Sequence, residues 1–402
     1  MRKFDFLIVG GGILGATISL ALKKRHPDSS ICLVEKEPSL GSHASTRNSG
    51  VIHSGVYYDP NSLKSKISKL GAQRMIDFHL ENGIKLNRIG KILVCTNENQ
   101  TNQIDFLLNR AKKNGIEAHL LNKEDLKKME PESQSYGERS IYIPFTSVGS
   151  PRETMNVLES KMIENKITIK TNAAFFKRTK KNEILLSNKE KLSYGIIINT
   201  SGAYADKIAH QFDIGKELVI LPFRGLYWQL SERSGIKINH LIYPVPDLRY
   251  PFLGIHTTTT TDNKIYFGPT ASPGFGREHY RGFSGINVGD SFKVLINSAK
   301  QLYSNKNNFR NLAIQEAKRM LKMEFFREAK KLVPNLRAEM LMSTSKAGIR
   351  AQLYDKDRGE LVNDFLAIRG DNDVHILNAI SPAWTCSLEM ADFICDNYID
   401  NS

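Results

Sequence analysis

The stretch FDFLIVGGGILGATISL, residues 4–20, determines the fold expected for this chain. Its apolar start predicts a buried strand, and the residues after the glycines have helical composition. Gly10, Gly12 and Gly15 have the spacing G-x-G-x-x-G between these two elements. Glycine at these positions permits a tight turn, a close approach of backbone to a pyrophosphate, and close packing of helix on strand. The stretch therefore predicts the first unit of a dinucleotide-binding domain.

The residues that follow this stretch support a cofactor site. The N–H groups of Ile13 and Leu14 would lie at a helix N-terminus, where a phosphate is favoured. A second apolar strand, residues 31–34, ends in Glu35 and Lys36. Glu35 stands twenty residues after Gly15, where an acid is expected to bind a ribose hydroxyl. This order of elements favours a dinucleotide site over a glycine-rich turn without function.

Two membrane-related interpretations of the N-terminal stretch are not favoured. A secretory signal would use its basic start, but Asp5 and three glycines interrupt the apolar run, and no small-x-small cleavage motif follows. No other window has about eighteen apolar residues, so a membrane-spanning helix is not expected. The four cysteines form no C-x-x-C pair and no metal-ligand spacing, which indicates a reducing compartment. We expect a cytoplasmic protein, with peripheral contact at the inner membrane surface left open.

The charge balance is strongly basic for a chain of this size. The 402 residues carry a net charge of +14 and are 41% hydrophobic, which is enough for about two domains with buried cores. An anionic substrate, an anionic membrane surface or a lysine-rich proteome would each account for the charge. Nucleic acid is not expected as a partner, because no recognised binding module accompanies the basic residues.

The pattern along the rest of the chain predicts alternation between two domains. Residues 194–200 form an uninterrupted apolar strand suited to the middle of a parallel sheet. Residues 253–269 alternate with period two about Asp262 and Asn263, which indicates a hairpin in an antiparallel sheet. A long helical region is expected at residues 308–332. Its basic and apolar stripe is typical of one core face and one solvated face, with contact to a membrane surface as the alternative. Other helices are expected at residues 64–82, 103–114, 122–129 and 152–165.

A second stretch, HASTRNSGVIHSGVYY at residues 43–58, carries the candidate redox chemistry. Its polar donors and Gly50 follow the second strand closely enough to reach the distal end of a cofactor. A turn of small residues at 199–203 could also pass close to the cofactor, although an ordinary strand-to-helix turn would look the same. The strand, glycine turn and helix at residues 4–20 would also suit a nicotinamide cofactor. A Gly/Ser-rich segment that ends in His53 favours a flavin.

Longer blocks of sequence carry a family resemblance. NSGVIHSGVYYDPNSLKSKISKLG (48–71), VILPFRGLYWQL (219–230) and HILNAISPAWTCSLEMADFI (375–394) resemble, in the same order, blocks of the L-2-hydroxyglutarate oxidase or dehydrogenase family. That family is part of the glycine oxidase and D-amino-acid oxidase-like superfamily of FAD-dependent oxidoreductases. AGIRAQLYDKDRGELVNDF (347–365) extends the resemblance, which spans nearly the whole chain.

The resemblance implies an α/β fold with a non-contiguous, Rossmann-like FAD-binding domain. A substrate domain built on an antiparallel sheet is inserted into it. The expected FAD-binding segments are residues 1–82, 148–212 and 336–402, and the expected substrate-domain segments are residues 83–147 and 213–335. The N-terminus of the last helix would point toward the flavin pyrimidine and stabilise the negative charge of reduced flavin. A plain N-cap followed by proline is the simpler interpretation of Ser381 and Pro382.

The resemblance also implies a set of site residues. The expected cofactor-binding residues are Gly10, Gly12, Ile13, Leu14, Gly15, Glu35, Lys36, Thr46, Arg47, Asn48, Ser49, Gly50, Ser201, Gly202, Gly348, Arg350, Ala379, Ser381 and Pro382. The expected catalytic residues are His53, Arg350, Tyr57, Tyr243 and Arg224, with Arg249 as a further candidate for a second carboxylate. No metal is expected.

The chemistry implied is oxidation of an L-2-hydroxy acid, with L-2-hydroxyglutarate as the first candidate. His53 would take the hydroxyl proton while hydride passes to flavin N5, and Arg350 would hold a carboxylate in its fork. Thr46 and Arg47 replace the Gly-His of most relatives, so no histidyl flavin link is expected there. Other hydroxy acids, an amino acid, and a flavin-binding partner protein without turnover remain as alternatives. The electron acceptor is left open between oxygen, a quinone and a carrier protein.

Overall fold

The parallel core of the molecule is an eight-stranded sheet that begins with the glycine-rich stretch. A computed structural model of the chain describes residues 2–248, 253–305 and 309–400. Strand β1 (Arg2–Val9) lies between β12 (Lys191–Asn199) and β2 (Ile31–Val34), and both pairings are parallel. Parallel strands β9 (Thr168–Lys170) and β21 (Asp373–Asn378) continue the sheet beyond β2 and β12. Strands β10 (Phe175–Lys180), β11 (Glu183–Leu186) and β20 (Leu366–Arg369) complete it.

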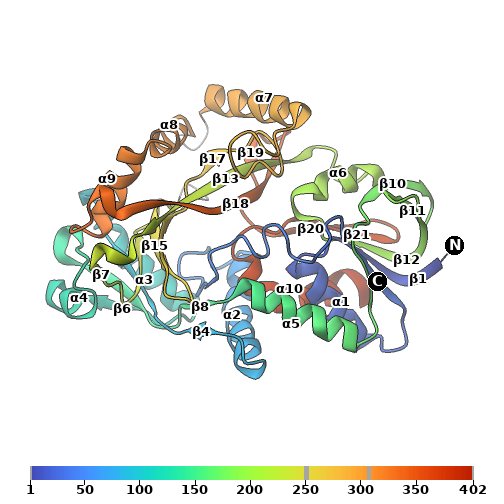
Figure 1. The fold of residues 1–402 in the computed structure, drawn as a ribbon, viewed down its shortest axis with the longest axis horizontal. Helices are drawn as coiled ribbons and strands as arrows, with labels where there is room; N and C mark the ends of the chain where they lie inside the picture. Colours follow the sequence, from blue (N-terminus) through green and yellow to red (C-terminus); the bar gives the residue numbers. More distant parts are fainter. Residues whose placement is uncertain (1, 249–252, 306–308, 401–402) are drawn as a thin grey trace.

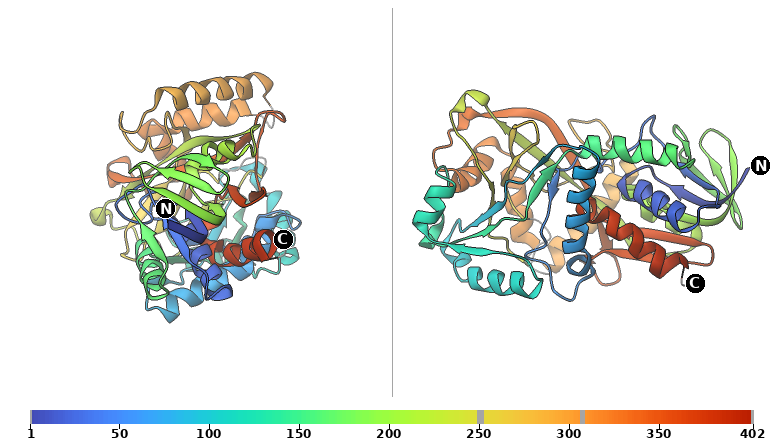
Figure 2. Two further views of the ribbon diagram at one scale, coloured as in Figure 1. Left: turned by 90° about the vertical axis from the view of Figure 1, so that its right-hand side faces the viewer. Right: turned by 90° about the horizontal axis from the view of Figure 1, so that it is seen from below.

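Helices from distant parts of the chain cover this sheet. Helix α1 (Ile13–Arg25) packs against α10 (Ala383–Cys395) and α5 (Pro151–Glu164), and α10 packs against α2 (Leu63–Glu81). Figures 1 and 2 show the N-terminal and C-terminal helices side by side on this part of the molecule. The short helix α6 (Ala205–Ala209) follows β12. The predicted parallel sheet, with strand 194–200 in its middle, is confirmed.

A second, antiparallel sheet of six strands lies next to the first (Figure 1). Its two long strands, β13 (Leu218–Leu230) and β18 (Leu341–Asp355), pair along most of their length. Strands β15 (His256–Thr259) and β16 (Ile265–Gly268) form the predicted hairpin, in which Asn263 takes a left-handed conformation. Strands β17 (Ser272–Pro273) and β19 (Glu360–Leu361) pair with β13 and β18. The expected antiparallel sheet is therefore present.

Two smaller sheets extend the second half of the fold. The first joins β14 (Leu241–Pro244), β5 (Lys91–Val94), β7 (Ser140–Ile143) and β6 (His119–Leu121). The second joins β3 (Val51–Ile52), β8 (Ser147–Gly149) and β4 (Leu86–Asn87). Helices α3 (Gln103–Lys113) and α4 (Lys123–Met129) match expected helices, and Asn122 caps α4 by accepting from the N–H of Asp125.

The expected long helix at 308–332 is two helices in the structure. Helix α8 (Phe309–Arg319) ends before Leu321, which has extended backbone angles, and α9 (Lys322–Leu332) begins after it. The change in direction lets Phe325 and Ala329 enter the core beneath β14 and β16, where both are fully buried. An additional helix, α7 (Val288–Ser304), precedes α8 at the top of Figure 1. Residue 308 lies outside the described part of the chain.

The fold places strands from three separated segments in the parallel sheet, as a non-contiguous cofactor domain requires. The expected segment 336–402 is divided between sheets, because β18 pairs with β13 whereas β20 and β21 belong to the parallel sheet. The boundaries proposed from the sequence therefore stay predictions. Within the described ranges, no helix combines the length and apolar character needed to cross a membrane.

Candidate active site and cofactor cleft

A cleft of about 700 Å³ lies between the parallel and antiparallel sheets. It is lined by the β1–α1 turn, residues 41–45 and 47–49, the end of β12, the middle of β18 and the start of α10. Most of the predicted cofactor residues line it: Gly10, Gly12, Ile13, Leu14, Glu35, Lys36, Arg47, Asn48, Ser49, Ser201, Gly202, Gly348, Arg350, Ala379, Ser381 and Pro382. Residues far apart in the sequence thus meet along one continuous surface.

The glycines of the first turn permit close contacts that a side chain would block. Gly10 has a φ of +112°, and a Cβ there would lie 2.7 Å from the carbonyl oxygen of Thr200. A Cβ on Gly15 would lie 2.0 Å from the carbonyl oxygen of Gly10, so α1 can pack on β1 only when this position is glycine. Gly15 supports the turn from behind and is not part of the cleft lining.

Polar contacts organise the N-terminus of α1. The N–H of Ile13 donates to Ser45 Oγ at 2.8 Å. The carboxylate of Glu35 accepts from the N–H groups of Gly11 at 2.7 Å and Glu37 at 2.9 Å. Glu35 is thereby fixed at the end of β2, with its side chain in the cleft lining. Sequence reasoning named the neighbours of Ser45 but missed Ser45 itself, although it belongs to the same Ser/Thr-rich segment.

Thr46 and Gly50, two further predicted cofactor residues, lie outside the cleft lining. Thr46 Oγ1 donates to the carbonyl of Gly41 at 2.6 Å and accepts from Arg152 at 3.0 Å. Gly50 has a φ of +77°, and a Cβ there would lie 2.5 Å from the carbonyl oxygen of Gly149. Both residues therefore shape the backbone that carries Arg47, Asn48 and Ser49 into the cleft.

A segment of the antiparallel half, which we call the strap (residues 274–287), reaches across to one end of the cleft. Glu278 of the strap accepts from Lys36 at 2.7 Å and from the hydroxyl of Tyr204 at 2.7 Å. The hydroxyl of Tyr280 lies 2.6 Å from His43 Nδ1, and its ring lies beneath the guanidinium of Arg47. Arg277 forms a buried ion pair with Asp206. Sequence reasoning missed these strap residues, because only the fold brings them near the β2 turn.

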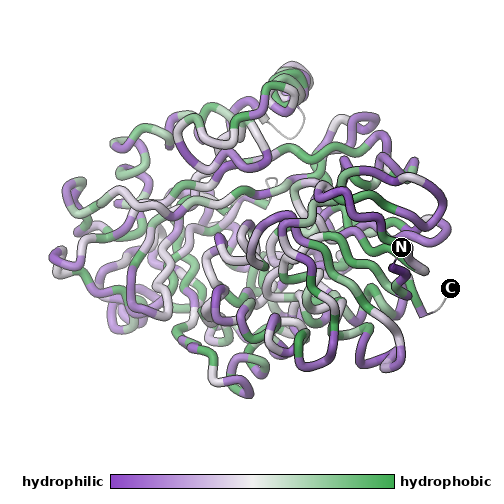
Figure 3. The backbone as a smooth tube through the Cα atoms, turned by 45° about the vertical axis from the view of Figure 1, so that its right-hand side comes forward, coloured by the Kyte–Doolittle hydropathy of each residue, from purple (hydrophilic) through white to green (hydrophobic). Residues whose placement is uncertain are grey.

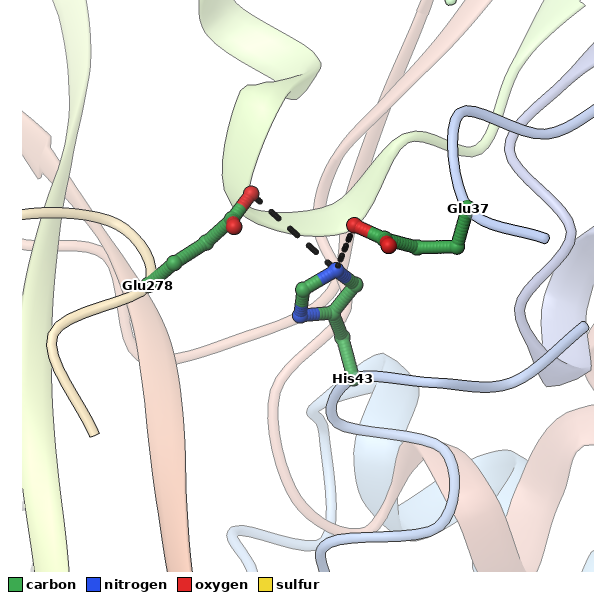
Figure 4. Close-up of side chains that lie close together, drawn as sticks. All are labelled: Glu37, His43 and Glu278. Atoms are coloured by element: carbon green, nitrogen blue, oxygen red, sulfur yellow. Dashed lines mark hydrogen bonds and ion pairs between the residues drawn. The ribbon is translucent and has the colours of Figure 1, made fainter. Parts of the chain in front are cut away.

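The strap meets the cofactor domain at a cluster of two carboxylates and a histidine. Figure 4 shows His43 between Glu37, 3.0 Å away, and Glu278, 4.0 Å away. Their spacing would suit a metal ion. Lys36 Nζ, however, contacts both carboxylates and lies 2.8 Å from His43 Nε2. Burial alone would lower the pKa of Lys36, but hydrogen bonds to Glu278 and Glu37 outweigh it and raise the pKa. The ammonium group of Lys36 already contacts both carboxylates, so we assign the cluster to the strap contact.

His53 lies at the opposite end of the cleft and is almost fully buried. The backbone N–H of His53 donates to Thr385 Oγ1 at 3.1 Å, and the Thr385 hydroxyl donates to the carbonyl of Val51 at 3.2 Å. These hydrogen bonds join the His53 loop to the start of α10. Burial, reinforced by the positive charges of Lys91, His256 and Arg350, lowers the pKa of His53 to about 3. At neutral pH the imidazole is uncharged and can accept a proton.

Arg350 approaches the same end of the cleft from β18. It pairs with Phe223 of β13, and burial lowers its pKa to about 10, so it still carries its charge at neutral pH. Two residues earlier, Gly348 lets the chain pass close to the 41–49 loop, since a Cβ there would lie 2.8 Å from the carbonyl oxygen of Arg47. The guanidinium is therefore held in the lining by the central strand pair of the antiparallel sheet.

A fully buried lysine lies behind His53, and sequence reasoning did not identify it. Lys91 Nζ lies 4.9 Å from the ring centre of Tyr57 and 5.2 Å from that of Tyr243. Tyr243 in turn stacks on His256 with 3.9 Å between ring centres. Burial lowers the pKa of Lys91 to about 7 and, as the largest cause, that of His256 to about 4. Tyr57 and Tyr243 thus enclose the lysine instead of lining the cleft.

The other predicted carboxylate-binding arginines are placed differently. Arg224 lies on β13 outside the lining, with its Nη1 3.1 Å from His279 Nε2 of the strap. Arg249 is outside the described residues. Arg350 is therefore the predicted catalytic arginine that the fold brings into the cleft with His53.

The residues of the cleft fit a flavin dinucleotide. A helix N-terminus with a glycine turn suits the pyrophosphate at one end. At the other end, His53 Nδ1 and the Nε1 of Trp384 are buried without a hydrogen-bond partner among the described residues. The start of α10, at residues 381–385, lies in the lining, with Pro382 as the N-cap residue and Ala383 as the first helical one. The expected plain N-cap had Ser381 as the cap and Pro382 as the first helical residue. In the structure Pro382 lies one position earlier, as the N-cap residue itself.

The Rossmann-like sheet and this cleft place the protein in the class of dinucleotide-dependent oxidoreductases. The family described as FAD dependent oxidoreductase (DAO) matches residues 5–396, and the chain belongs to it. FAD is the cofactor of this family, as the sequence predicted. The fold class is confirmed by solved structures. FAD-bound L-alpha-glycerophosphate oxidase from Mycoplasma pneumoniae has a TM-score of 0.76 at 24% identity, covering 98% of this chain and 94% of that one. Glycine oxidase from Geobacillus kaustophilus has a TM-score of 0.73 at 16% identity, covering 98% and 94%.

Proteins with higher sequence identity identify the part of this family that the chain resembles most. A protein named L-2-hydroxyglutarate dehydrogenase from Escherichia coli strain K12 is 32% identical over 97% of this chain and 92% of its own length. The mitochondrial protein of the same name from Homo sapiens is 32% identical over 98% of this chain and 88% of its own length. The resemblance found in the sequence is therefore confirmed over nearly the whole chain.

Proposed function

We propose that this protein oxidises L-2-hydroxyglutarate to the 2-oxo acid with FAD. Similarity to full-length proteins of that name supports the substrate. The observation that carries the proposal is the buried basic environment of His53, to which Arg350 and Lys91 contribute positive charge. A substrate with two carboxylates would neutralise such a site, whereas a zwitterionic amino acid would bring a further cation into it.

Each group has a role that follows from its environment. Neutral His53 accepts the proton of the substrate hydroxyl at a ring nitrogen, because its low pKa keeps it unprotonated before the substrate binds. Arg350 holds one carboxylate through two parallel N–H donors and orients the carbon that is oxidised. Bound FAD supplies the acceptor for the hydride that leaves this carbon. Loss of the proton and the hydride together converts the C–OH group into C=O.

Repeated turnover also requires an electron acceptor that reoxidises the reduced protein. The acceptor that reoxidises the protein belongs to one of three classes: oxygen, a quinone or a carrier protein. Mixing the reduced protein with oxygen, a soluble quinone or an artificial carrier separates these classes by the rate of flavin reoxidation. We also propose that the basic chain makes peripheral contact with an anionic membrane surface.

The test of the substrate uses the purified holoprotein under anaerobic conditions. Addition of L-2-hydroxyglutarate should bleach the oxidised flavin spectrum, and the D-enantiomer and L-lactate serve as controls for chirality and for the second carboxylate. Bleaching by an amino acid in preference to L-2-hydroxyglutarate would contradict the proposed substrate. A flavin that no hydroxy or amino acid reduces would instead indicate a flavin-binding partner protein without turnover.

A further inference from the structure

Helix α7 has mostly polar residues on its inner side, where Val294 is a buried apolar exception, and large apolar residues on its outer side. Asp290 and Gln301 are 7% and 5% exposed, whereas Val288 and Tyr303 are 84% and 87% exposed. Outward apolar residues recur every three or four positions, the spacing of a single helix face. A surface helix of a water-soluble protein normally has the opposite orientation. The outer face therefore requires an explanation outside the core.

Ion pairs hold α7 in this orientation. Asp290, in its first turn, lies 2.9 Å from Lys207 Nζ and 3.5 Å from Arg277 Nε. Asn287 caps the helix by accepting from the N–H of Asp290. Because Lys207 follows β12 and Arg277 belongs to the strap, the polar face of α7 is tied to both halves of the molecule. Rotation of the apolar face into the core would break these contacts.

The outward residues form one surface with the end of the strap. We define the α7 patch by its large exposed apolar residues, which are Phe283, Ile286, Val288, Phe292, Leu295, Ile296, Leu302 and Tyr303. Figures 1 and 3 show α7 at the outer edge of the molecule, with hydrophobic positions along it. Contiguous exposed apolar residues on this scale mark a docking surface for a protein or a membrane.

The exposed charges in the sequence region that carries the α7 patch are of one sign. In sequence positions 281–322 the only acidic residues are Asp290 and Glu316, and both are buried in ion pairs. Exposed basic residues of the same region are Arg281, Lys300, Arg310, Lys318 and Lys322. We call these basic residues the basic rim; together with an apolar face they are complementary to a layer of anionic headgroups over hydrocarbon. Two copies of this face would repel each other through the same rim.

We propose that the α7 patch inserts into the headgroup region of an anionic phospholipid membrane. This inference rests on the peripheral membrane contact of the proposed function and assigns that contact to one surface. The large apolar side chains enter the interface, and the basic rim binds the lipid phosphates. The strap joins this surface to the cofactor cleft, since Arg277 contacts Asp290 of α7 while Glu278 contacts Lys36 of the cleft.

The experiment is vesicle sedimentation with the FAD-loaded, full-length protein. Vesicles of phosphatidylcholine alone are compared with vesicles that also contain phosphatidylglycerol. The apolar test variant combines Phe292→Ser and Leu295→Ser. Its control combines Ile163→Ser and Leu80→Ser, which are similarly exposed on α5 and α2. The charge variant combines Lys300→Glu and Lys318→Glu. Its control combines Lys177→Glu and Lys191→Glu, which change the net charge equally at exposed positions of the parallel half.

We expect the wild-type protein to bind the anionic vesicles. The Phe292/Leu295 variant should bind at least about tenfold more weakly, and the Lys300/Lys318 variant should lose binding to a similar degree, while both controls stay within about twofold. In a Phe292→Trp variant, the emission of the new tryptophan should shift to shorter wavelength when anionic vesicles are added.

Three outcomes would overturn the inference. Absence of wild-type binding would remove the membrane contact and leave a protein partner to explain the patch. Equal losses in the test and control variants would show that binding uses overall charge without the α7 patch. A dimer in solution that dissociates in the Phe292/Leu295 variant would assign the patch to a second copy. Flavin bleaching by L-2-hydroxyglutarate is measured separately, so failure of the membrane contact is distinguishable from failure of the proposed substrate.

Discussion

His53 shows how burial and neighbouring charge can prepare a single side chain for proton transfer. Its imidazole is enclosed in the cleft, and the basic groups around it disfavour a second positive charge. The His53 backbone is held by Thr385 at the start of α10, so the ring has a defined position relative to that helix. A histidine prepared in this way accepts a proton only when a bound anion offsets the positive surroundings.

Replacement of His53 tests this role. We expect His53→Ala to retain bound flavin but to slow flavin reduction by L-2-hydroxyglutarate by roughly 10² or more, because the hydroxyl proton loses its acceptor. Rapid-mixing absorbance of the anaerobic protein measures the rate, and His119→Ala on the surface provides the control. A reduction rate equal to that of the wild-type protein would exclude His53 as the base.

Lys91 differs from a surface lysine because it is fully buried and has no acidic partner among the residues that the structure describes. With a pKa lowered to about 7 by burial, it is cationic below that pH and neutral above it. A cation near His53 and His256 attracts a dianion, so affinity for a dicarboxylate should fall as the pH rises through about 7. Binding of the dianion stabilises the charged lysine and moves this transition to higher pH.

Lys91→Met should separate this electrostatic role from stability. We expect weaker binding of 2-oxoglutarate and a flatter pH dependence of that binding within about one pH unit of the lysine pKa. The free energy of unfolding should rise by about 1–3 kcal/mol, because a buried charge is removed. Flavin absorbance titrations and thermal melts measure these quantities. An unchanged pH slope would show that another group controls binding.

At the level of secondary structure, the β1–α1 unit depends on the absence of side chains. The Cβ of any residue at position 15 would overlap the carbonyl of Gly10 and push α1 away from β1. This contact lies within six residues, and the glycine spacing therefore revealed it. In contrast, no glycine or proline marks the break between α8 and α9. The break depends on Phe325, which enters a core formed by residues far away in the sequence.

Gly15→Ala should weaken cofactor binding through this packing. Displacement of α1 moves the N–H groups of its first turn away from the pyrophosphate position, so we expect the dissociation constant for FAD to increase by at least about tenfold. Fluorescence titration of the apoprotein with FAD measures the constant. Gly289→Ala, where a Cβ meets only ordinary contacts, is the matched control. Equal affinities in both variants would contradict this explanation.

At the scale of the whole molecule, the strap connects the two halves at one end of the cleft. It leaves the antiparallel sheet and contacts Lys36, His43 and Tyr204 of the parallel half through Glu278 and Tyr280. Arg277 adds ion pairs with Asp206 and Asp290. The strap residues and α7 are therefore one connected polar network, and opening the cleft would break it.

Glu278→Gln should loosen this connection without altering the redox end of the cleft. Loss of the charged contact with Lys36 should increase the rate of FAD release by about tenfold, in line with the strength of a charge-assisted hydrogen bond. The appearance of free FAD fluorescence after dilution gives the rate. Glu138→Gln, which removes an exposed ion pair with Lys123, is the control. If the Glu278→Gln variant releases FAD no faster than the wild-type protein, the strap does not retain the cofactor.

Local sequence was sufficient for the parallel sheet, the glycine turn, the hairpin and most of the helices, because each depends on propensity and periodicity within a short stretch. It also located His53 and Arg350, through blocks that resemble a known family. Lys91, the strap residues and the outward face of α7 depended on the folded chain. Periodicity shows that a helix has an apolar face, but ion pairs with Lys207 and Arg277, distant in the sequence, decide which way that face points.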